Sequence, residues 1–137
     1  MRRWYFGLVP LVLMAAGLAL GWSGSPDRPA NKHTIGIHFS RFESGVIEVQ
    51  AGMPVTIELR NDDPIEHEWI VGDELTHRAH RFGTEPYHDE IPTEVTIPAF
   101  GTKTTVVTFD KPGEYAFICH LPGHEAYGMR GVVKVVE

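Results

Sequence analysis

The chain is poor in the residues and motifs on which many enzymes depend. Only one of its 137 residues is a cysteine, Cys119. A single thiol excludes an internal disulfide, a zinc site of four cysteines and a binuclear copper centre bridged by two thiolates. The sequence also lacks Gly-x-Ser-x-Gly, His-Glu-x-x-His and a phosphate-binding glycine loop. These absences leave hydrolytic chemistry without support, and we expect that the protein is not an enzyme.

Positive charge is also scarce. Lysine and arginine total 12 residues against 18 aspartates and glutamates, which gives a formal net charge of −6 at pH 7. No basic cluster follows the first three residues, and this argues against a nucleic-acid partner. An acidic surface keeps a protein soluble and can also steer a basic partner protein toward it.

The longest run without charge lies at the N-terminus. Two arginines precede a stretch from Trp4 to Trp22 that is rich in Leu, Val, Ala and Gly. A basic start followed by an apolar run predicts a signal peptide over residues 1–22. The run is also near the roughly 17–25 residues that span a bilayer, so a retained membrane anchor through residues 4–22 stays equally open. Either alternative predicts an extracytoplasmic protein, in the periplasm or on the outer face of the cytoplasmic membrane.

The rest of the chain has the pattern of one β-rich domain. Residues 23–32 have the composition of a linker, and residues 33–137 are long enough for one core. Helical periodicity is scarce there, whereas short β-rich runs alternate with turn residues. This pattern predicts an all-β, Greek-key, two-sheet sandwich with about eight antiparallel strands. The predicted strands are Thr34–Phe39, Val46–Gln50, Val55–Arg60, Glu68–Val71, Glu94–Ile97, Thr102–Phe109, Gly113–Cys119 and Gly131–Val136.

One long polar insertion, residues 72–92, interrupts the strand pattern. It holds His77, His80 and His88, and the first two are spaced to share one face of a helical turn. Loops of this length are uncommon in compact domains and are often functional. Two interpretations stay open. In one, the insertion is a solvated excursion with a short helix, and in the other it forms a second, weaker metal site or a partner-docking arm.

The most informative motif lies near the C-terminus, where Cys119, His124 and Met129 follow one another at five-residue steps. A thiolate, an imidazole and a weak thioether are three of the four ligands of a blue-copper electron-transfer site. His67, on a strand-like stretch about fifty residues upstream, offers the second imidazole. The candidate metal ligands are therefore His67, Cys119, His124 and Met129, around a single type 1 copper ion.

Two other metal sites fit the sequence less well. Zinc accepts one Cys and two His ligands, but Met129 is a poor neighbour for such a site. His120 directly follows the cysteine, as a histidine does in multicopper oxidases, yet the chain has none of the His-x-His pairs that a trinuclear cluster needs. We expect His120 to lie at the surface or to support a ligand.

These residues together resemble the cupredoxin family, which includes plastocyanin, azurin, rusticyanin and auracyanin. The resemblance covers about residues 33–137 and includes Gly113-Glu114-Tyr115 before the cysteine and Cys-x4-His-x4-Met. That spacing is similar to rusticyanin and auracyanin, and the long insertion is similar to periplasmic cupredoxins linked to copper resistance. The resemblance implies equatorial ligation by His67, Cys119 and His124 and an axial contact from Met129.

One residue departs from the family pattern. Many cupredoxins place Asn or Ser directly after the first histidine ligand, where this chain has Glu68. An ionised carboxylate cannot donate a hydrogen bond toward the thiolate. The surroundings of the sulfur, and with them the reduction potential, are therefore expected to differ from those of such relatives.

Two functions remain open on the sequence. The resemblance implies a monomeric carrier of single electrons between extracytoplasmic redox proteins. The alternative is a periplasmic protein that binds and sequesters copper, with His77, His80 and His88 as auxiliary ligands. The two differ in stoichiometry, because a carrier holds one copper ion and a sequestering protein holds more.

Overall fold

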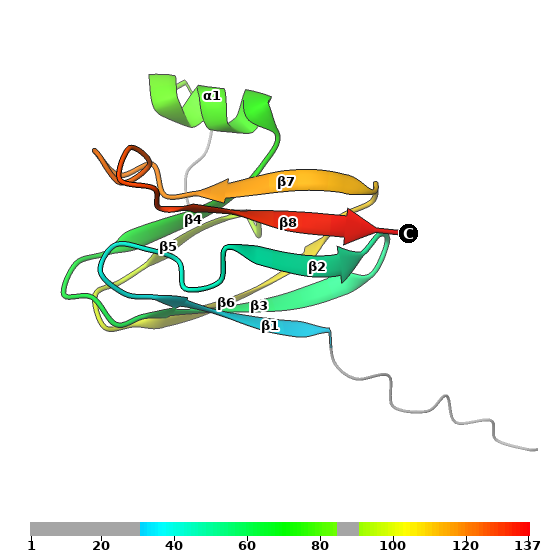
Figure 1. Ribbon diagram of the computed structural model, residues 1–137, viewed down its shortest axis with the longest axis horizontal. Coiled ribbons are helices and arrows are strands. Elements are labelled where there is room, and N and C mark those ends of the chain that lie inside the picture. The colour runs from blue at the N-terminus through cyan, green and yellow to red at the C-terminus, as the bar shows by residue number, and fades with distance from the viewer. Residues whose placement is uncertain (1–30, 85–90) are drawn as a thin grey trace, which may run out of the picture.

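Two β-sheets pack face to face in the computed structural model, which describes residues 31–84 and 91–137 (Figure 1). One sheet has the strand order β1-β3-β6, formed by Lys32–Ile37, Pro54–Asn61 and Thr102–Thr108. The other has the order β2-β8-β7-β4-β5, formed by Val46–Gln50, Arg130–Val136, Gly113–Ile118, His67–Gly72 and Glu94–Ile97. The prediction of a two-sheet sandwich with eight strands is confirmed for the described residues.

Two strand pairs differ from the antiparallel pairing that the sequence predicted. Strand β1 pairs with β3 in parallel, and β2 pairs with β8 in parallel. The chain therefore changes sheets between β1 and β2. Strand order depends on contacts between distant segments, so the local alternation of side chains did not reveal it.

The core lies between the two sheets and follows from alternating side chains. In β3, Val55, Ile57 and Leu59 are fully buried, whereas the residues between them are more exposed. Trp69 and Phe117 lie in the same apolar cluster and are also fully buried. Burial of each such aliphatic side chain is worth about 1.5–3 kcal/mol relative to leaving it in water. This cluster holds the two sheets together.

The insertion contains one helix, α1, which spans Glu74–Phe82 and packs against β4. The Asp73 side chain caps its start by accepting a hydrogen bond from the Thr76 N–H, and Gly83 ends it with a left-handed backbone, φ 61°. The predicted short helix is therefore present. The helix is not a purely solvated excursion, because His77 on its inner face is only 1% exposed.

Several expectations fall on residues outside the described ranges. The predicted signal peptide or anchor, residues 1–22, and most of the linker lie there, as does His88 in the insertion. Within residues 31–84 and 91–137, no helix is long and apolar enough to cross a membrane.

The loops at one end of the sandwich are tied together by Asn61. Strand β3 ends at this residue and β4 begins at His67, directly opposite the end of β5 at Ile97. The Asn61 side-chain amide donates hydrogen bonds to the carbonyls of Ile65 and Pro98, at 2.7 and 3.0 Å. Its carbonyl oxygen accepts from the Asp63 N–H at 2.9 Å. One buried side chain thus fixes the turn that precedes His67.

Candidate metal centre

The loop from β7 to β8 carries three of the predicted ligands, and backbone hydrogen bonds close it on itself. The Cys119 N–H donates to the Met129 carbonyl at 3.2 Å, and the Met129 N–H donates to the His124 carbonyl at 3.0 Å. The His124 N–H in turn donates to the Leu121 carbonyl at 3.0 Å. Gly123 permits the tight turn with a left-handed backbone, φ 86°. The three side chains are therefore held by the backbone and by the two flanking strands.

His67 reaches the same place from the first position of β4. Its Nε2 lies 2.9 Å from Asp63 Oδ2, and its side chain is completely buried. An ionised carboxylate can only accept a hydrogen bond, so Nε2 carries the ring proton. The other ring nitrogen, Nδ1, then presents a lone pair toward the Cys119 loop.

The donor atoms of these residues converge. His67 Nδ1 lies 3.3 Å from His124 Nδ1, and that nitrogen lies 3.3 Å from Cys119 Sγ. Among the described residues, this is the group of His, Cys, Asp and Glu side chains whose ligand atoms all lie within 4.8 Å of one another. Nitrogen and sulfur ligands at about 2.0–2.3 Å from one ion lie roughly 3–4 Å apart. The spacing therefore fits a single metal ion.

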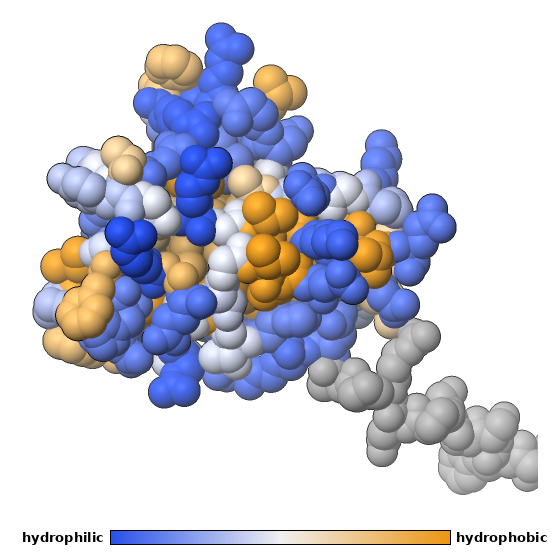
Figure 2. All heavy atoms as spheres, in the orientation of Figure 1, coloured by the Kyte–Doolittle hydropathy of each residue, from blue (hydrophilic) through white to orange (hydrophobic). Residues whose placement is uncertain are grey.

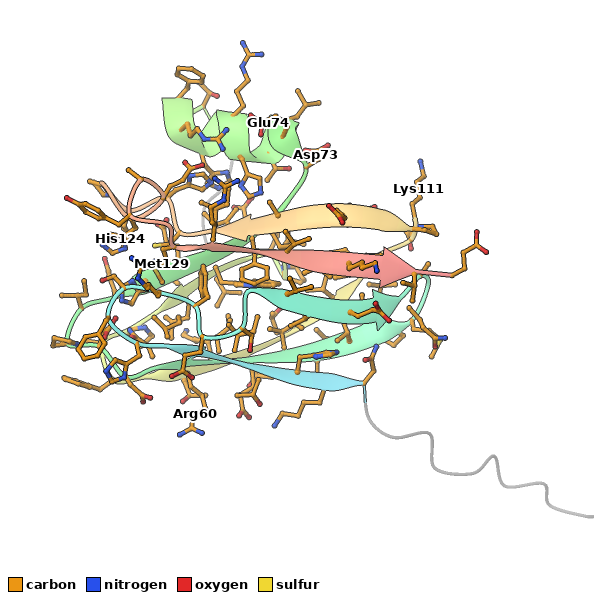
Figure 3. The ribbon with its side chains drawn as sticks, in the orientation of Figure 1. Arg60, Asp73, Glu74, Lys111, His124 and Met129 are labelled. Carbon is orange, nitrogen blue, oxygen red and sulfur yellow. The ribbon has the colours of Figure 1, made fainter. Side chains whose placement is uncertain are left out.

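Met129 lies at the same end of the sandwich as His124 (Figure 3). Its side chain is fully buried, in the apolar cluster that also contains Cys119. A thiolate, two imidazoles and a thioether form the donor set that copper prefers, because soft sulfur suits Cu(I) and imidazole suits both valences. The residues present fit copper. Ligation by each of the four side chains stays a prediction.

The thiol is set in surroundings that keep it protonated until a metal binds. Burial raises the pKa of Cys119, and the Glu68 charge adds to this effect, against hydrogen bonds from the Glu68 and Leu121 N–H groups. The Glu68 N–H lies 3.4 Å from Cys119 Sγ. A backbone donor thus contacts the sulfur even though an ionised Glu68 side chain cannot donate a hydrogen bond to it.

Asp63 is a residue whose part in this site the sequence did not reveal. Burial alone would raise the pKa of its carboxyl, but hydrogen bonds from the Ser40 and Phe39 N–H groups and from His67 lower it. The two backbone bonds are each 2.7 Å long. They hold Phe39 and Ser40 in left-handed backbone conformations, φ 51° and 52°, which are unfavourable for side-chain-bearing residues. One carboxylate therefore links His67 to the loop after β1.

The His120 side chain is buried, so the alternative of a surface position is wrong. Its side chain is 6% exposed, and its Nε2 lies 3.0 Å from His77 Nδ1. Desolvation by burial, together with nearby His77, lowers the pKa of His120 to about 4. Burial likewise lowers the pKa of His77. Both imidazoles are therefore neutral at pH 7.

These pKa shifts predict how the metal-free protein responds to acid. A histidine in an unfolded chain has a pKa of about 6.5, whereas burial lowers the pKa of folded His120 to about 4. Between these values the unfolded state binds more protons, so stability falls as the pH drops from 7 toward 5. We expect a lower urea midpoint at pH 5 than at pH 7, with a smaller difference in His120→Gln. A midpoint that stays constant or rises on acidification contradicts the burial of neutral histidines.

Comparison with known proteins places the chain in a family. Residues 12–135 match the model of the cupredoxin-like domain, and the chain belongs to that family. The chain is also similar to the copper-resistant cuproprotein CopI of Rubrivivax gelatinosus, with 33% identity over 99 residues. That alignment covers 69% of this chain and 59% of the length of CopI, so the relative is considerably longer than the matched part.

The fold is also that of the auracyanins. Auracyanin B superposes with a TM-score of 0.66 at 19% identity, covering 82% of this chain and 93% of that protein. Auracyanin A of Chloroflexus aurantiacus, described as a blue copper protein, gives 0.62 at 25% identity, covering 77% of this chain and 98% of its own. The predicted resemblance to the cupredoxins is confirmed.

Proposed function

We propose that the protein carries single electrons between extracytoplasmic redox proteins by means of one type 1 copper ion. His67, Cys119, His124 and Met129 hold the ion, and copper supplies a one-electron couple when bound. The observation that carries this proposal is the convergence of His67 Nδ1, His124 Nδ1 and Cys119 Sγ within 4.8 Å. The burial of His67 and Cys119 and the backbone hydrogen bonds that close the ligand loop favour a geometry that changes little between valences.

His124 offers the route by which electrons reach the site. It is half-buried, whereas Cys119, Met129 and His67 are fully buried. Its ring is therefore the part of the ligand set nearest to solvent. An electron that passes through this ring avoids crossing the rest of the protein.

The surface around this end of the sandwich suits contact with another protein. Four large apolar side chains are exposed on its loops, namely Phe39, Ile65, Phe100 and Tyr127, at 84%, 47%, 73% and 72%. Figure 2 shows apolar side chains at this end of the face in view. Exposed apolar groups with a polar rim are typical of protein-binding sites. They support a transient redox partner, and the acidic net charge favours a basic one.

Copper titration with visible absorption and cyclic voltammetry tests this function. We expect an intense thiolate-to-copper absorption band that saturates at one equivalent, and a reversible one-electron wave. A band without a reversible wave would contradict a carrier and leave only copper binding.

Glu68 gives a quantitative prediction about the potential. It is 7% exposed, and its charge acts on both Cys119 and His124. A negative charge near the ion stabilises the more positive valence, so it lowers the reduction potential. Replacement Glu68→Gln should therefore raise the potential by tens of millivolts while the absorption band is kept. Voltammetry of the two proteins measures this, and an unchanged or lower potential contradicts the assigned effect of the carboxylate.

A second function is favoured by the similarity to CopI, whose name links it to copper resistance. In this alternative the protein binds copper to remove it from solution rather than to pass electrons. A sequestering protein should take up more than one ion and should protect cells from added copper. Deletion of the gene distinguishes the two, since loss of a carrier impairs electron transfer without copper stress.

A further inference from the structure

A cluster of histidines outside the copper ligand set lies between α1 and the ligand loop. His77 and His80 come from the inner face of α1, His120 follows Cys119, and Glu94 begins β5. The His77 residue is 1% exposed, and the side chains of His80, His120 and Glu94 are 2%, 6% and 8% exposed. Figure 3 shows nitrogen-bearing side chains gathered beneath α1. Three imidazoles and a carboxylate are rarely buried together without a cation or a network of hydrogen bonds.

The backbone fixes the orientation of two of these rings. His80 Nδ1 lies 2.9 Å from the Thr76 carbonyl, and His77 Nε2 lies 3.1 Å from the Ala116 carbonyl. A carbonyl only accepts, so each of these nitrogens carries a proton. Ligating histidines in metal sites are held in this way, with one N–H on a backbone oxygen and the other nitrogen directed at the ion.

The second ring nitrogens of His77 and His80 each contact another member of the cluster. His77 Nδ1 lies 3.0 Å from His120 Nε2, and His80 Nε2 lies 3.5 Å from Glu94 Oε2. Contact between an imidazole nitrogen and a buried carboxylate oxygen is favourable when a positive charge lies between them. A proton on His80 is one such charge, and a metal ion is the other.

We propose that His77, His80, His120 and Glu94 form a second site, for a divalent transition-metal ion. Each contact pair has about the spacing of two ligands on one ion. Stacking of His80 on His120, with ring centroids 5.4 Å apart, keeps the pairs adjacent. Imidazole with carboxylate suits Zn(II) and Cu(II), and Cu(II) binds more tightly. Because the rings must move closer to share one ion, this site is weaker than the one at Cys119.

The helix is anchored where such a site needs it. Arg81 donates to Glu125 on the ligand loop, at 2.7 Å from Nη2, and to Glu74 at 2.8 Å from Nη1. The bond to Glu125 holds α1 against the loop that carries His120, whereas the bond to Glu74 lies within the helix. The second site therefore lies between two segments that are already held together by an ion pair.

Titration of the full chain with Cu(II), followed by visible absorption and electron paramagnetic resonance, tests the proposal. The first equivalent of Cu(II) should produce the thiolate-to-copper absorption band. The second equivalent should add a new electron paramagnetic resonance signal and should not increase that absorption band. Pulsed electron paramagnetic resonance of the second copper ion should detect nitrogen couplings from at least two imidazole ligands. Saturation at one equivalent, or a second ion without imidazole ligands, overturns the proposal and leaves His80 and Glu94 as an ion pair.

Two variants locate the second ion. In His80→Gln and in Glu94→Gln, its affinity should fall by about 10-fold or more, while the thiolate band of the first equivalent is kept and shows that the protein is folded. His38→Gln is the matched control, since His38 is exposed, and it should bind both ions normally. A second ion that is unaffected in both variants lies elsewhere and refutes this site. Absence of the thiolate-to-copper band when copper is added to the wild-type protein would instead contradict the proposed electron carrier.

Discussion

Replacing Asp63 by Asn should weaken copper binding by about 10- to 100-fold, the usual effect of removing a hydrogen-bond partner from a metal-ligating histidine. Asp63 accepts from His67 Nε2 at 2.9 Å and from two backbone N–H groups at 2.7 Å each. An amide of the same shape has one accepting oxygen, so at least one buried donor loses its partner. The restraint that directs His67 Nδ1 to the metal also weakens, because a neutral amide oxygen accepts a weaker hydrogen bond than a carboxylate does. Competition titration with a copper chelator measures the change.

The same substitution should destabilise the metal-free protein by about 1–3 kcal/mol, the cost of a buried donor without a partner. The left-handed conformations of Phe39 and Ser40 depend on these bonds, so the loop after β1 should lose order as well. Asp62→Asn is the matched control, because its neighbour Asp62 is exposed and should change stability by no more than about 0.5 kcal/mol. Equal effects of the two substitutions on stability would contradict the supporting role of Asp63 in the site.

The second large effect is expected at the thiol. Replacement Cys119→Ser should abolish the intense absorption band completely, because the band arises from charge transfer between a thiolate and copper. Affinity for copper should fall by more than the roughly 100-fold that supporting residues account for. The serine hydroxyl is similar in size to the thiol of the fully buried Cys119, so the variant should keep the fold.

A matched control for this variant is Met129→Leu, which removes only the weak axial donor. That protein should keep a thiolate band, shifted in energy, and should show a changed potential, because the axial ligand tunes both. Visible absorption at equal copper loading compares the variants. Persistence of the full band in Cys119→Ser would mean that the absorbing site lies elsewhere.

The strands were the part of the fold most readily predicted from sequence, because the apolar alternation is local. Val46–Gln50 and Glu94–Ile97 have the predicted bounds. The first strand ends at Ile37 rather than at Phe39, since Asp63, 24 residues away, draws the Phe39 backbone into a left-handed turn. The parallel pairing of β1 with β3 and of β2 with β8 was also not predictable, because each strand pairs with one that is distant in sequence.

The candidate site divides in the same way. The spacing of Cys119, His124 and Met129 is a local signal, and the chemistry of copper required one more imidazole, which His67 supplies. Asp63 has the appearance of an ordinary turn residue, and nothing near it in sequence distinguishes it from Asp62. Only the folded chain shows that its carboxylate is buried against the His67 ring.

The histidine cluster beneath α1 was only half visible in the sequence. The spacing of His77 and His80 predicted one shared helical face, which the structure has. Their partners His120 and Glu94 are 40 and 14 residues from His80, on other elements, and sequence gave no reason to join them. Contacts of this kind depend on how α1 packs over the sheet (Figure 1).

Diffraction from crystals of the copper-loaded protein, collected at the copper absorption edge, tests the central claim most directly. We expect the strongest anomalous peak between His67 Nδ1, His124 Nδ1 and Cys119 Sγ, about 2.0–2.3 Å from each, with Met129 on the axial side. A peak at which the His67 ring turns away, or one that lacks the sulfur of Cys119, would contradict the account.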